Sequence, residues 1–337
     1  MQQVWIPRIG PPEVLELRQA PDPRPGPGQV RIAVEAAGVN FADLMARMGL
    51  YPDAPRLPAV VGYEAAGSID AVGDGAEPSR VGEPVLALTR FGGYSSRLCV
   101  PAAQAVRRPS GLDAAAAAAI PVNGLTAWMM LEEMGRLRAG DRVLVHGAGG
   151  GVGLLALDLI RRRGAVAVGA ASPGKHAWLR ARGYDQLVDA RAPLPAQLPP
   201  GSFDLVLDPV GGRSWAEGLQ LLRPGGRIVL YGFSANAGGE RRSLVRVLRN
   251  LAAIPWWRLG PIALINHNQG VLGVNLGRMW QHAELAARWL AELLRLWEQG
   301  ALRPHVHARV PFSRAAEAHR ILHRRENLGK VVLVPDP

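Results

Sequence analysis

Residues 142–153 read RVLVHGAGGGVG, and LLALDLI follows at residues 154–160. The apolar, β-branched start of the first stretch predicts a strand, its glycines predict a tight turn, and the second stretch has the apolar spacing of a helix. Glycines at such a turn let the backbone approach a pyrophosphate, which the free N–H groups and the positive dipole end of the helix then hold. The strand–turn–helix context therefore predicts a dinucleotide site at Gly150, Gly151 and Val152.

The composition is that of a globular protein with about two domains: 337 residues, of which 48% are hydrophobic and 20% charged. A single cysteine, Cys99, excludes an internal disulfide framework and favours a cytoplasmic protein. The net charge of +11 is almost entirely arginine, because Lys175 and Lys330 are the only lysines. The arginines are scattered, which argues against nucleic-acid binding. They fit either a solvated arginine-rich surface or attraction to anionic partners such as phosphorylated cofactors or acidic lipids.

Targeting and membrane signals are weak. The N-terminus lacks the basic start and apolar run of a signal peptide. The longest apolar stretch, residues 114–131, is interrupted by Pro121, Asn123 and Gly124, so we expect no clean membrane span.

The order of strand and helix candidates predicts the fold class. Pro and Gly punctuate short apolar runs in the first third, which is typical of β-structure. The middle alternates strands and helices, which calls for a parallel sheet with helices on both faces. We therefore expect an α/β fold, with a doubly wound parallel-sheet domain at residues 123–262 and a β-rich domain at residues 1–122. Residues 263–337 should add the last strand of the parallel sheet and then return to the first domain, whose sheet the strand at residues 329–334 should complete.

The end of the second parallel strand predicts which nicotinamide cofactor is bound. NAD-binding proteins place an acidic side chain there to hold the ribose hydroxyls. Residues 168–175 contain no Asp or Glu and carry Ser172 and Lys175 instead. A hydroxyl and a cation can both donate to a 2′-phosphate, so this pattern favours NADPH. Ser172 could alternatively, or in addition, cap the helix that follows.

Together with its surroundings, the glycine loop resembles the medium-chain dehydrogenase/reductase superfamily, and specifically its zinc-free quinone oxidoreductases. The resemblance covers nearly the whole chain. Within that family, the chain looks closest to the branch of the synaptic-vesicle amine-transport protein homologues. The segments that carry the resemblance are residues 38–52, 58–67, 123–127, 203–212, 225–232 and 327–335.

The resemblance implies a Rossmann domain that binds NADPH and a GroES-like catalytic domain. It places Asn40 and Tyr51 at the reacting end of the cofactor, Asn40 as a donor to cofactor or substrate and Tyr51 as a donor to the substrate oxygen or a proton relay. Tyr51 could instead only shape the pocket, and Asn40 could be a turn residue at a strand end. The further cofactor-binding residues implied are Thr126, Arg191, Tyr231, Ser234, Asn327 and Lys330.

Two positions depart from relatives of this kind. Ala190 stands where a Tyr that helps to hold the adenosine phosphate is expected, and Arg191 could substitute for it. Asn40, Phe41 and Tyr63 occupy positions where zinc-dependent relatives carry their Cys and His ligands, so we expect no metal site.

These features predict an NADPH-dependent, zinc-independent reductase that transfers hydride to quinones or α,β-unsaturated carbonyl compounds. One alternative is an enoyl-type reductase of natural-product biosynthesis, and another is a nucleotide-binding protein associated with membranes or lipids that has weak catalysis. We also expect a homodimer, because the apolar strand at residues 271–275 should lie at a sheet edge, where bare strands pair.

Residues 240–258 alternate arginines with apolar residues at helical spacing and end near the pair Trp256–Trp257. Such a segment could lie on a membrane surface. It could instead form a wall of the substrate pocket or a subunit contact, and the sequence favours either of these over the membrane surface.

Overall fold

The computed structural model describes residues 1–240 and 242–337 and divides into two compact units. The first unit comprises Met1–Leu125, Gly239–Arg242 and Leu276–Pro337, and the second comprises Thr126–Gly238 and Ser243–Asn275. The expected fold class is confirmed: one unit is built on a parallel, Rossmann-like sheet and the other is β-rich and GroES-like.

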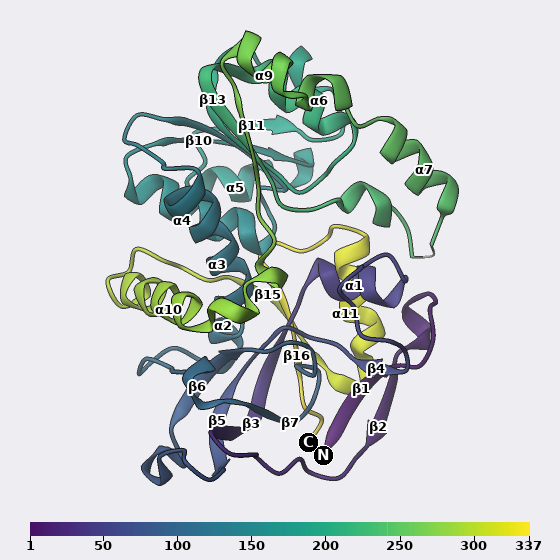
Figure 1. Cartoon of the computed structure of the whole chain (residues 1–337), viewed down its shortest axis with the longest axis vertical. Helices are drawn as coiled ribbons and strands as arrows, with labels where there is room; N and C mark the ends of the chain where they lie inside the picture. The colour runs from purple at the N-terminus through teal and green to yellow at the C-terminus, as the bar shows by residue number, and fades with distance from the viewer. Residues whose placement is uncertain (241) are drawn as a thin grey trace. The chain divides into compact units, whose positions relative to one another are not determined.

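The second unit contains a six-stranded parallel sheet with the strand order β11-β10-β9-β12-β13-β14. This is the order expected of a doubly wound dinucleotide-binding sheet. Its strands are β9 (Arg142–His146), β10 (Val166–Ala171), β11 (Gln186–Asp189), β12 (Phe203–Asp208), β13 (Leu222–Leu230) and β14 (Gly270–Gly273). The helices between them are α4 (Gly151–Arg162), α5 (His176–Arg182), α6 (Arg213–Leu221), α7 (Leu244–Ala252), α8 (Trp256–Leu259) and α9 (Pro261–His267) (Figure 1).

Burial explains why the central strands are continuous apolar runs. Val143, Leu144 and Val145 of β9 are all fully buried, as are Leu205 and Val206 of β12. A parallel sheet covered by helices on both faces needs apolar residues at successive positions, not at alternate ones. The expected edge position of β14 is also confirmed, because it pairs with β13 alone among the described residues.

The first unit is built on a seven-stranded sheet of order β15-β16-β3-β5-β6-β8, with β7 paired to β3, and a three-stranded sheet of order β2-β1-β4. The strand β16 pairs antiparallel with β3, with Val331 opposite Val39, so the C-terminal segment completes this sheet as expected. The strands are β1 (Gln2–Ile6), β2 (Glu16–Gln19), β3 (Gln29–Val39), β4 (Ala59–Val60), β5 (Glu64–Val72), β6 (Pro84–Leu88), β7 (Arg97–Pro101), β8 (Ala105–Arg107), β15 (Val306–Pro311) and β16 (Lys330–Val334). The helices are α1 (Phe41–Arg47), α2 (Ala114–Ala117), α10 (Ala283–Glu298) and α11 (Ala315–His323).

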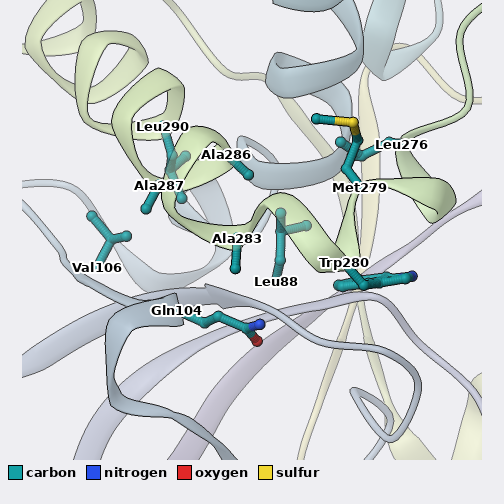
Figure 2. Close-up of a pocket in the computed structure, with 10 residues that line it drawn as sticks. All are labelled: Leu88, Gln104, Val106, Leu276, Met279, Trp280, Ala283, Ala286, Ala287 and Leu290. Carbon is teal, nitrogen blue, oxygen red and sulfur yellow. The ribbon is translucent and has the colours of Figure 1, made fainter.

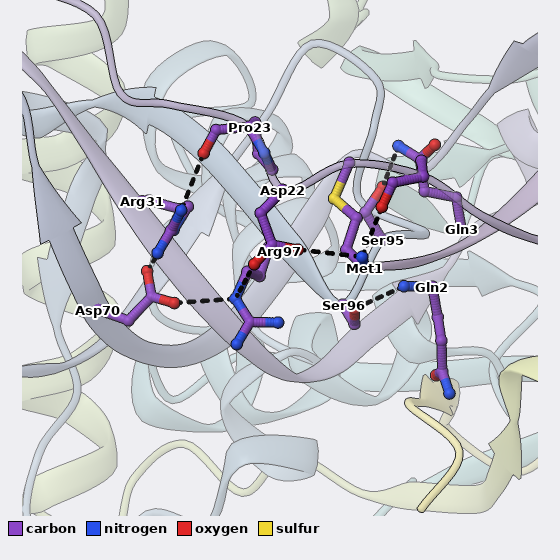
Figure 3. Close-up of polar contacts among 11 residues, drawn as sticks. Met1, Gln2, Gln3, Asp22, Pro23, Arg31, Asp70, Ser95, Ser96 and Arg97 are labelled. Atoms are coloured by element: carbon purple, nitrogen blue, oxygen red, sulfur yellow. Dashed lines mark hydrogen bonds and ion pairs between the residues drawn. The ribbon is translucent and has the colours of Figure 1, made fainter.

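Polar contacts fix the start of the chain to this sheet (Figure 3). The N-terminal ammonium lies 3.0 Å from Asp22, which also pairs with Arg97. Asp70 accepts from both Arg97 and Arg31. The two ends of the chain lie side by side, because the Gln2 side chain accepts a hydrogen bond from the backbone of Asp336.

The apolar stretch that the sequence analysis considered interrupted is divided, because a turn at residues 118–120 separates α2 from the helix that begins at Pro121. Residues 114–134 contain α2, α3 (Pro121–Trp128) and a π-helical turn, and by length and composition alone this segment could cross a membrane. The expected interruption at Pro121 is thus present, whereas Asn123 and Gly124 lie inside α3 and do not interrupt it. However, 78% of its apolar window is buried inside the protein, as in a core helix.

Candidate functional site

The glycine loop has the geometry of a phosphate-binding turn. Gly147 follows β9 with φ +65°, which favours glycine. A Cβ on Gly153 would lie 2.6 Å from the Gly147 carbonyl oxygen, so the first turn of α4 can pack this closely only with glycine there. Gly150, Gly151 and Val152 form the start of this twelve-residue helix, whose first N–H groups have no partner within the helix. The residues present therefore fit a dinucleotide pyrophosphate.

Ser172 directly follows β10, and Lys175 ends the short 3₁₀ turn that leads from there into α5. Ser172 precedes this turn but makes no side-chain capping hydrogen bond, so the alternative in which it caps the helix is not what the structure shows. The imidazole of His176 is hydrogen-bonded to the carbonyl of Ala171 at 3.0 Å. The strand end therefore carries a hydroxyl and an ammonium group and no acid.

Arg191 lies in the loop after the neighbouring strand β11 and is engaged within that loop. Its guanidinium lies 3.0 Å from the carboxylate of Asp189, and its backbone N–H donates to the same carboxylate. These hydrogen bonds lower the pKa of Asp189. Asp189 was not among the residues singled out from the sequence, and it competes with any phosphate for Arg191.

Three further predicted residues belong to the second unit, one of them buried and two half-buried. Thr126 on α3 is buried. Tyr231 follows β13, and burial raises the pKa of its phenol, which stays protonated at neutral pH. Ser234 lies nearby in sequence and its N–H donates to the carbonyl of Pro209 at 2.8 Å.

A pair of buried polar side chains that sequence reasoning missed lies at the ends of the two central strands. His146 ends β9 and Asp208 ends β12, with 3.7 Å between His146 Nε2 and an Asp208 oxygen. His146 Nε2 and Asp208 Oδ2 have no hydrogen-bond partner among the described residues. Open sheets of this kind bind ligands at the carboxyl ends of their strands, so these orphaned atoms also fit a ligand there.

In the first unit, Asn40 and Lys330 are brought together by a residue that the sequence analysis did not single out, Glu64. The Lys330 ammonium lies 2.5 Å from Glu64 Oε1 and donates to Asn40 Oδ1 at 2.6 Å. Asn40 Nδ2 donates to Glu64 Oε1 at 2.8 Å, and the backbone N–H of Val122 donates to Glu64 Oε2. All three side chains are buried. Gly38 makes room for the carboxylate, because a Cβ there would lie 2.3 Å from Glu64 Oε1.

This cluster changes what Asn40 can do. Its oxygen is occupied by Lys330, and one of its two amide hydrogens is occupied by Glu64. The contact of its amide nitrogen with the carbonyl of Gly38 is 3.5 Å long and therefore weak. Asn40 can therefore donate one amide hydrogen to a ligand, but its oxygen is not available as an acceptor. Asn40 also lies between the end of β3 and the first turn of α1, as the alternative of a turn residue expects, and its side chain bridges two charged groups.

Asn327 lies in the turn that leads into β16. Its side-chain amide donates to the carbonyl of Gly329 at 2.8 Å. Gly329 has φ +80°, and a Cβ there would lie 2.2 Å from the carbonyl oxygen of His305. Asn327 thus closes the turn that delivers Lys330 to Glu64.

Tyr51 lies in an aromatic group. Its ring meets the ring of Tyr63 edge-on at 6.2 Å, and Tyr63 stacks against Trp280 at 6.2 Å with an interplanar angle of 11°. Burial raises the pKa of the Tyr51 phenol, so its hydroxyl is a proton donor at neutral pH. The packing is compatible with the role of Tyr51 as a wall of the pocket.

Figure 2 shows an apolar pocket of the first unit beneath α10, to which Trp280 also contributes. Its other lining residues include Leu88 of β6, Val106 of β8 and Leu290 of α10, with Gln104 as a polar side chain. No residue predicted from the sequence lines this pocket in the part of the chain that the structure describes. It is thus separate from the Asn40–Glu64–Lys330 cluster.

The positions discussed for zinc carry Asn40, Phe41 and Tyr63. Over residues 1–240 and 242–337, no group of three or more His, Cys, Asp or Glu side chains is placed to hold a metal ion.

Comparison with known proteins identifies the family. The model of the alcohol dehydrogenase GroES-like domain matches residues 26–110, and the model of the zinc-binding dehydrogenase matches residues 182–333. The synaptic vesicle membrane protein VAT-1 homolog of Rattus norvegicus is 39% identical over 331 residues, which cover 96% of this chain and 81% of that protein. A quinone oxidoreductase of Pseudomonas aeruginosa is 33% identical, with 99% of both chains covered.

The chain belongs to the quinone oxidoreductase-type family of medium-chain dehydrogenases/reductases. The structure of the Escherichia coli quinone oxidoreductase complexed with NADPH superposes with a TM-score of 0.86 at 26% identity, over 99% of this chain and all of that one. The resemblance inferred from the sequence is thus confirmed at the level of the family. The coarse assignment as an oxidoreductase of this family is confirmed with it.

Proposed function

We propose that this oxidoreductase uses NADPH to reduce quinones or α,β-unsaturated carbonyl compounds, without a metal ion. The observation that carries the proposal is the pairing of the glycine loop before α4 with Ser172 and Lys175 after β10. The loop fits the pyrophosphate, and the two polar side chains suit a 2′-phosphate, which a carboxylate would repel.

When bound, NADPH supplies the hydride. The chain's own residues then have to orient the reacting groups and stabilise negative charge on the acceptor oxygen. Asn40 offers one amide hydrogen, held in place by Glu64 and Lys330. Tyr51 offers a hydroxyl that is protonated at neutral pH. Quinones and enones delocalise the charge they receive, so a few such donors suffice without a Lewis acid.

The test is a panel of NADPH and NADH oxidation rates with quinones, simple enones and bulky enoyl thioesters. We expect turnover with NADPH on quinones or simple enones, unaffected by a chelator. Turnover confined to enoyl thioesters would favour the biosynthetic enoyl reductase, and loss of activity with a chelator would contradict the metal-free proposal. Absence of turnover throughout the panel, with NADPH bound, would contradict the catalytic proposal itself.

We propose membrane association as a second property, because of the exposed face of α7. Its side chains Leu244, Val245 and Leu248 are 57%, 78% and 66% exposed, whereas Arg246 and Asn250 are less exposed. The helix is therefore amphipathic with its apolar side outward. Such a face lowers its free energy by entering a lipid interface or another apolar surface.

The surroundings of α7 suit an anionic membrane. Trp256 and Trp257 are 66% and 71% exposed, and the Arg258 guanidinium lies over the Trp257 ring at 4.8 Å. Residues 241–283 contain no Asp or Glu. Basic side chains among exposed tryptophans are typical of interfacial helices.

Vesicle flotation tests this second property. We expect the protein to float with phosphatidylcholine vesicles containing phosphatidylglycerol and less with phosphatidylcholine alone. The double variant Val245→Glu/Leu248→Glu should stay unbound, whereas Val81→Glu, at an exposed apolar position of the first unit, should float normally. A change of oligomeric state in the double variant, with no flotation of the wild type, would identify a subunit contact instead.

A further inference from the structure

Asp43 is a fully buried carboxylate directly behind the candidate site of the first unit. Its Oδ2 accepts hydrogen bonds from the backbone N–H of Asn40 at 2.8 Å and from the hydroxyl of Tyr94 at 3.0 Å. Its Oδ1 accepts from the backbone N–H of Gly62 at 3.1 Å. One side chain thus ties the residue that begins α1 to the turn just before Glu64.

A chain of hydrogen bonds leads from Asp43 to a buried arginine. Tyr94 Oη lies 3.3 Å from His319 Nε2, and Arg47 Nε donates to His319 Nδ1 at 3.2 Å. Because an arginine can only donate, Nδ1 is the acceptor and Nε2 carries the imidazole proton. His319 therefore donates to Tyr94, and Tyr94 donates to Asp43. Each hydrogen bond points from Arg47 toward the carboxylate.

This series of hydrogen bonds links the positively charged Arg47 to the negatively charged Asp43. The Arg47 side chain is fully buried and donates to the carbonyl of Gly10 and to His323 Nε2. Among the residues that the structure describes, no ion pair joins Arg47 to a carboxylate. The oriented hydroxyl and imidazole dipoles stabilise a positive group at one end and a negative group at the other.

We propose that Asp43 is a positioning residue for the reaction, which holds Asn40 and Glu64 in register with Lys330, and that Tyr94, His319 and Arg47 keep its carboxylate ionised. The proposal rests on the proposed function of that cluster. Asn40 and Glu64 belong to separate segments, and Asp43 is the group that fixes the backbone of one and the turn before the other. Loss of its negative charge should therefore displace the amide of Asn40.

Protonation of Asp43 supplies a natural test. Burial raises its pKa to about 7. Its neighbours Asn40 N–H and Gly62 N–H can only donate, so a proton added to the carboxyl must either weaken one of these two contacts or reverse the hydrogen bond with the Tyr94 hydroxyl. The charged and titratable groups that act on it are Tyr94 in the loop before β7, Lys330 on β16, Glu64 on β5, His319 on α11, Arg47 on α1, and Tyr51 and Tyr63.

The first measurement needs no turnover. In protein labelled with ¹⁵N-asparagine, the side-chain amide signals of Asn40, assigned by their absence in Asn40→Ser, are followed from pH 5.5 to 8.5. We expect a shift with a midpoint near 7 in the wild type and none in Asp43→Asn. The matched control Asp70→Asn removes a carboxylate that pairs with Arg31 and Arg97 on the same sheet, and it should retain the shift.

The second measurement is the pH profile of turnover. We expect kcat of the wild type to fall below pH 7, and Asp43→Asn to lose at least tenfold in kcat together with this acidic limb, with KM for NADPH little changed. Tyr94→Phe removes one donor to the carboxylate, which raises the pKa of Asp43 and moves the limb to higher pH. An unshifted limb in Tyr94→Phe overturns the proposal even if Asp43→Asn fails to fold. So does an Asn40 signal that titrates equally in Asp43→Asn. A wild type without turnover whose Asn40 signal titrates near 7 contradicts the proposed function only.

Discussion

The carboxylate of Glu64 and the ammonium of Lys330 form a buried ion pair at 2.5 Å that joins the start of β5 to the start of β16. Removing one partner of such a pair leaves an uncompensated charge, which costs about 3–5 kcal/mol. We therefore expect Lys330→Met to lower the free energy of unfolding by that amount in urea denaturation, and Glu64→Gln/Lys330→Met to lower it less. The exposed pair of Arg309 with Asp113 is the control, because Arg309→Met should cost at most about 1 kcal/mol. Additive losses in the double variant would show that the two groups act independently.

Lys175→Ala tests the cofactor. A lost charge-assisted hydrogen bond costs roughly 1.5–3 kcal/mol, so NADPH should bind about tenfold to a hundredfold more weakly while NADH binding barely changes. Fluorescence titration with both nucleotides measures this. Equal losses for the two would mean that Lys175 does not contact the 2′-phosphate.

Tyr51→Phe removes the hydroxyl and keeps the ring that packs on Tyr63. A single donor to a developing oxyanion is typically worth about 10²–10³ in rate. Because quinones and enones spread their charge, we expect kcat to fall by that range or less. Unchanged turnover with a good enone would leave Tyr51 the role of a pocket wall alone.

The exposed edge of β14 predicts a homodimer. Light scattering at micromolar concentration should give twice the mass of the chain. Leu272→Lys should shift the equilibrium toward monomer by placing a charge on the edge strand, whereas Val166→Lys, at the start of β10, should not. A monomeric wild type would count against the prediction.

His319 should make the fold sensitive to acid. Burial and the nearby Arg47 charge hold its pKa well below the ordinary value of 6.5, so the folded protein keeps it neutral while the unfolded chain takes up a proton. Its contribution to stability is present above pH 6.5 and is lost below it, by about 1.4 kcal/mol per pH unit. Asp43 acts in the opposite sense, because burial raises the pKa of its carboxyl to about 7 in the folded protein. The contribution of Asp43 to the free energy of unfolding is therefore largest at low pH and is lost as the pH rises to about 7. We expect the stability difference between wild type and His319→Gln to shrink as pH falls from 7 to 5, and a constant difference would contradict this.

The local sequence was sufficient to predict the glycine loop and the alternating strands and helices around it, because each is determined by residues close together in the chain. Glu64 was visible only as part of the segment 58–67. Its pairing with Lys330 arises from the antiparallel contact of β3 with β16, which no local spacing indicates. Likewise, helical periodicity showed that residues 244–252 form a helix but not that its apolar face points outward. The contacts that occupy the Asn40 oxygen and one of its amide hydrogens are tertiary information of the same kind.

The contact between β3 and β16 has a consequence for the order in which the molecule can assemble on the ribosome. The strands of the second unit lie within residues 142–273, so its sheet has all its members well before synthesis reaches β16. The strand that leads to Asn40 is made early, yet its neighbour β16 and the ammonium of Lys330 emerge last. Until then the Glu64 carboxylate has no cation and water can solvate it. The parallel sheet of the second unit can therefore form on a nascent chain before the side chain of Asn40 acquires its partner Lys330.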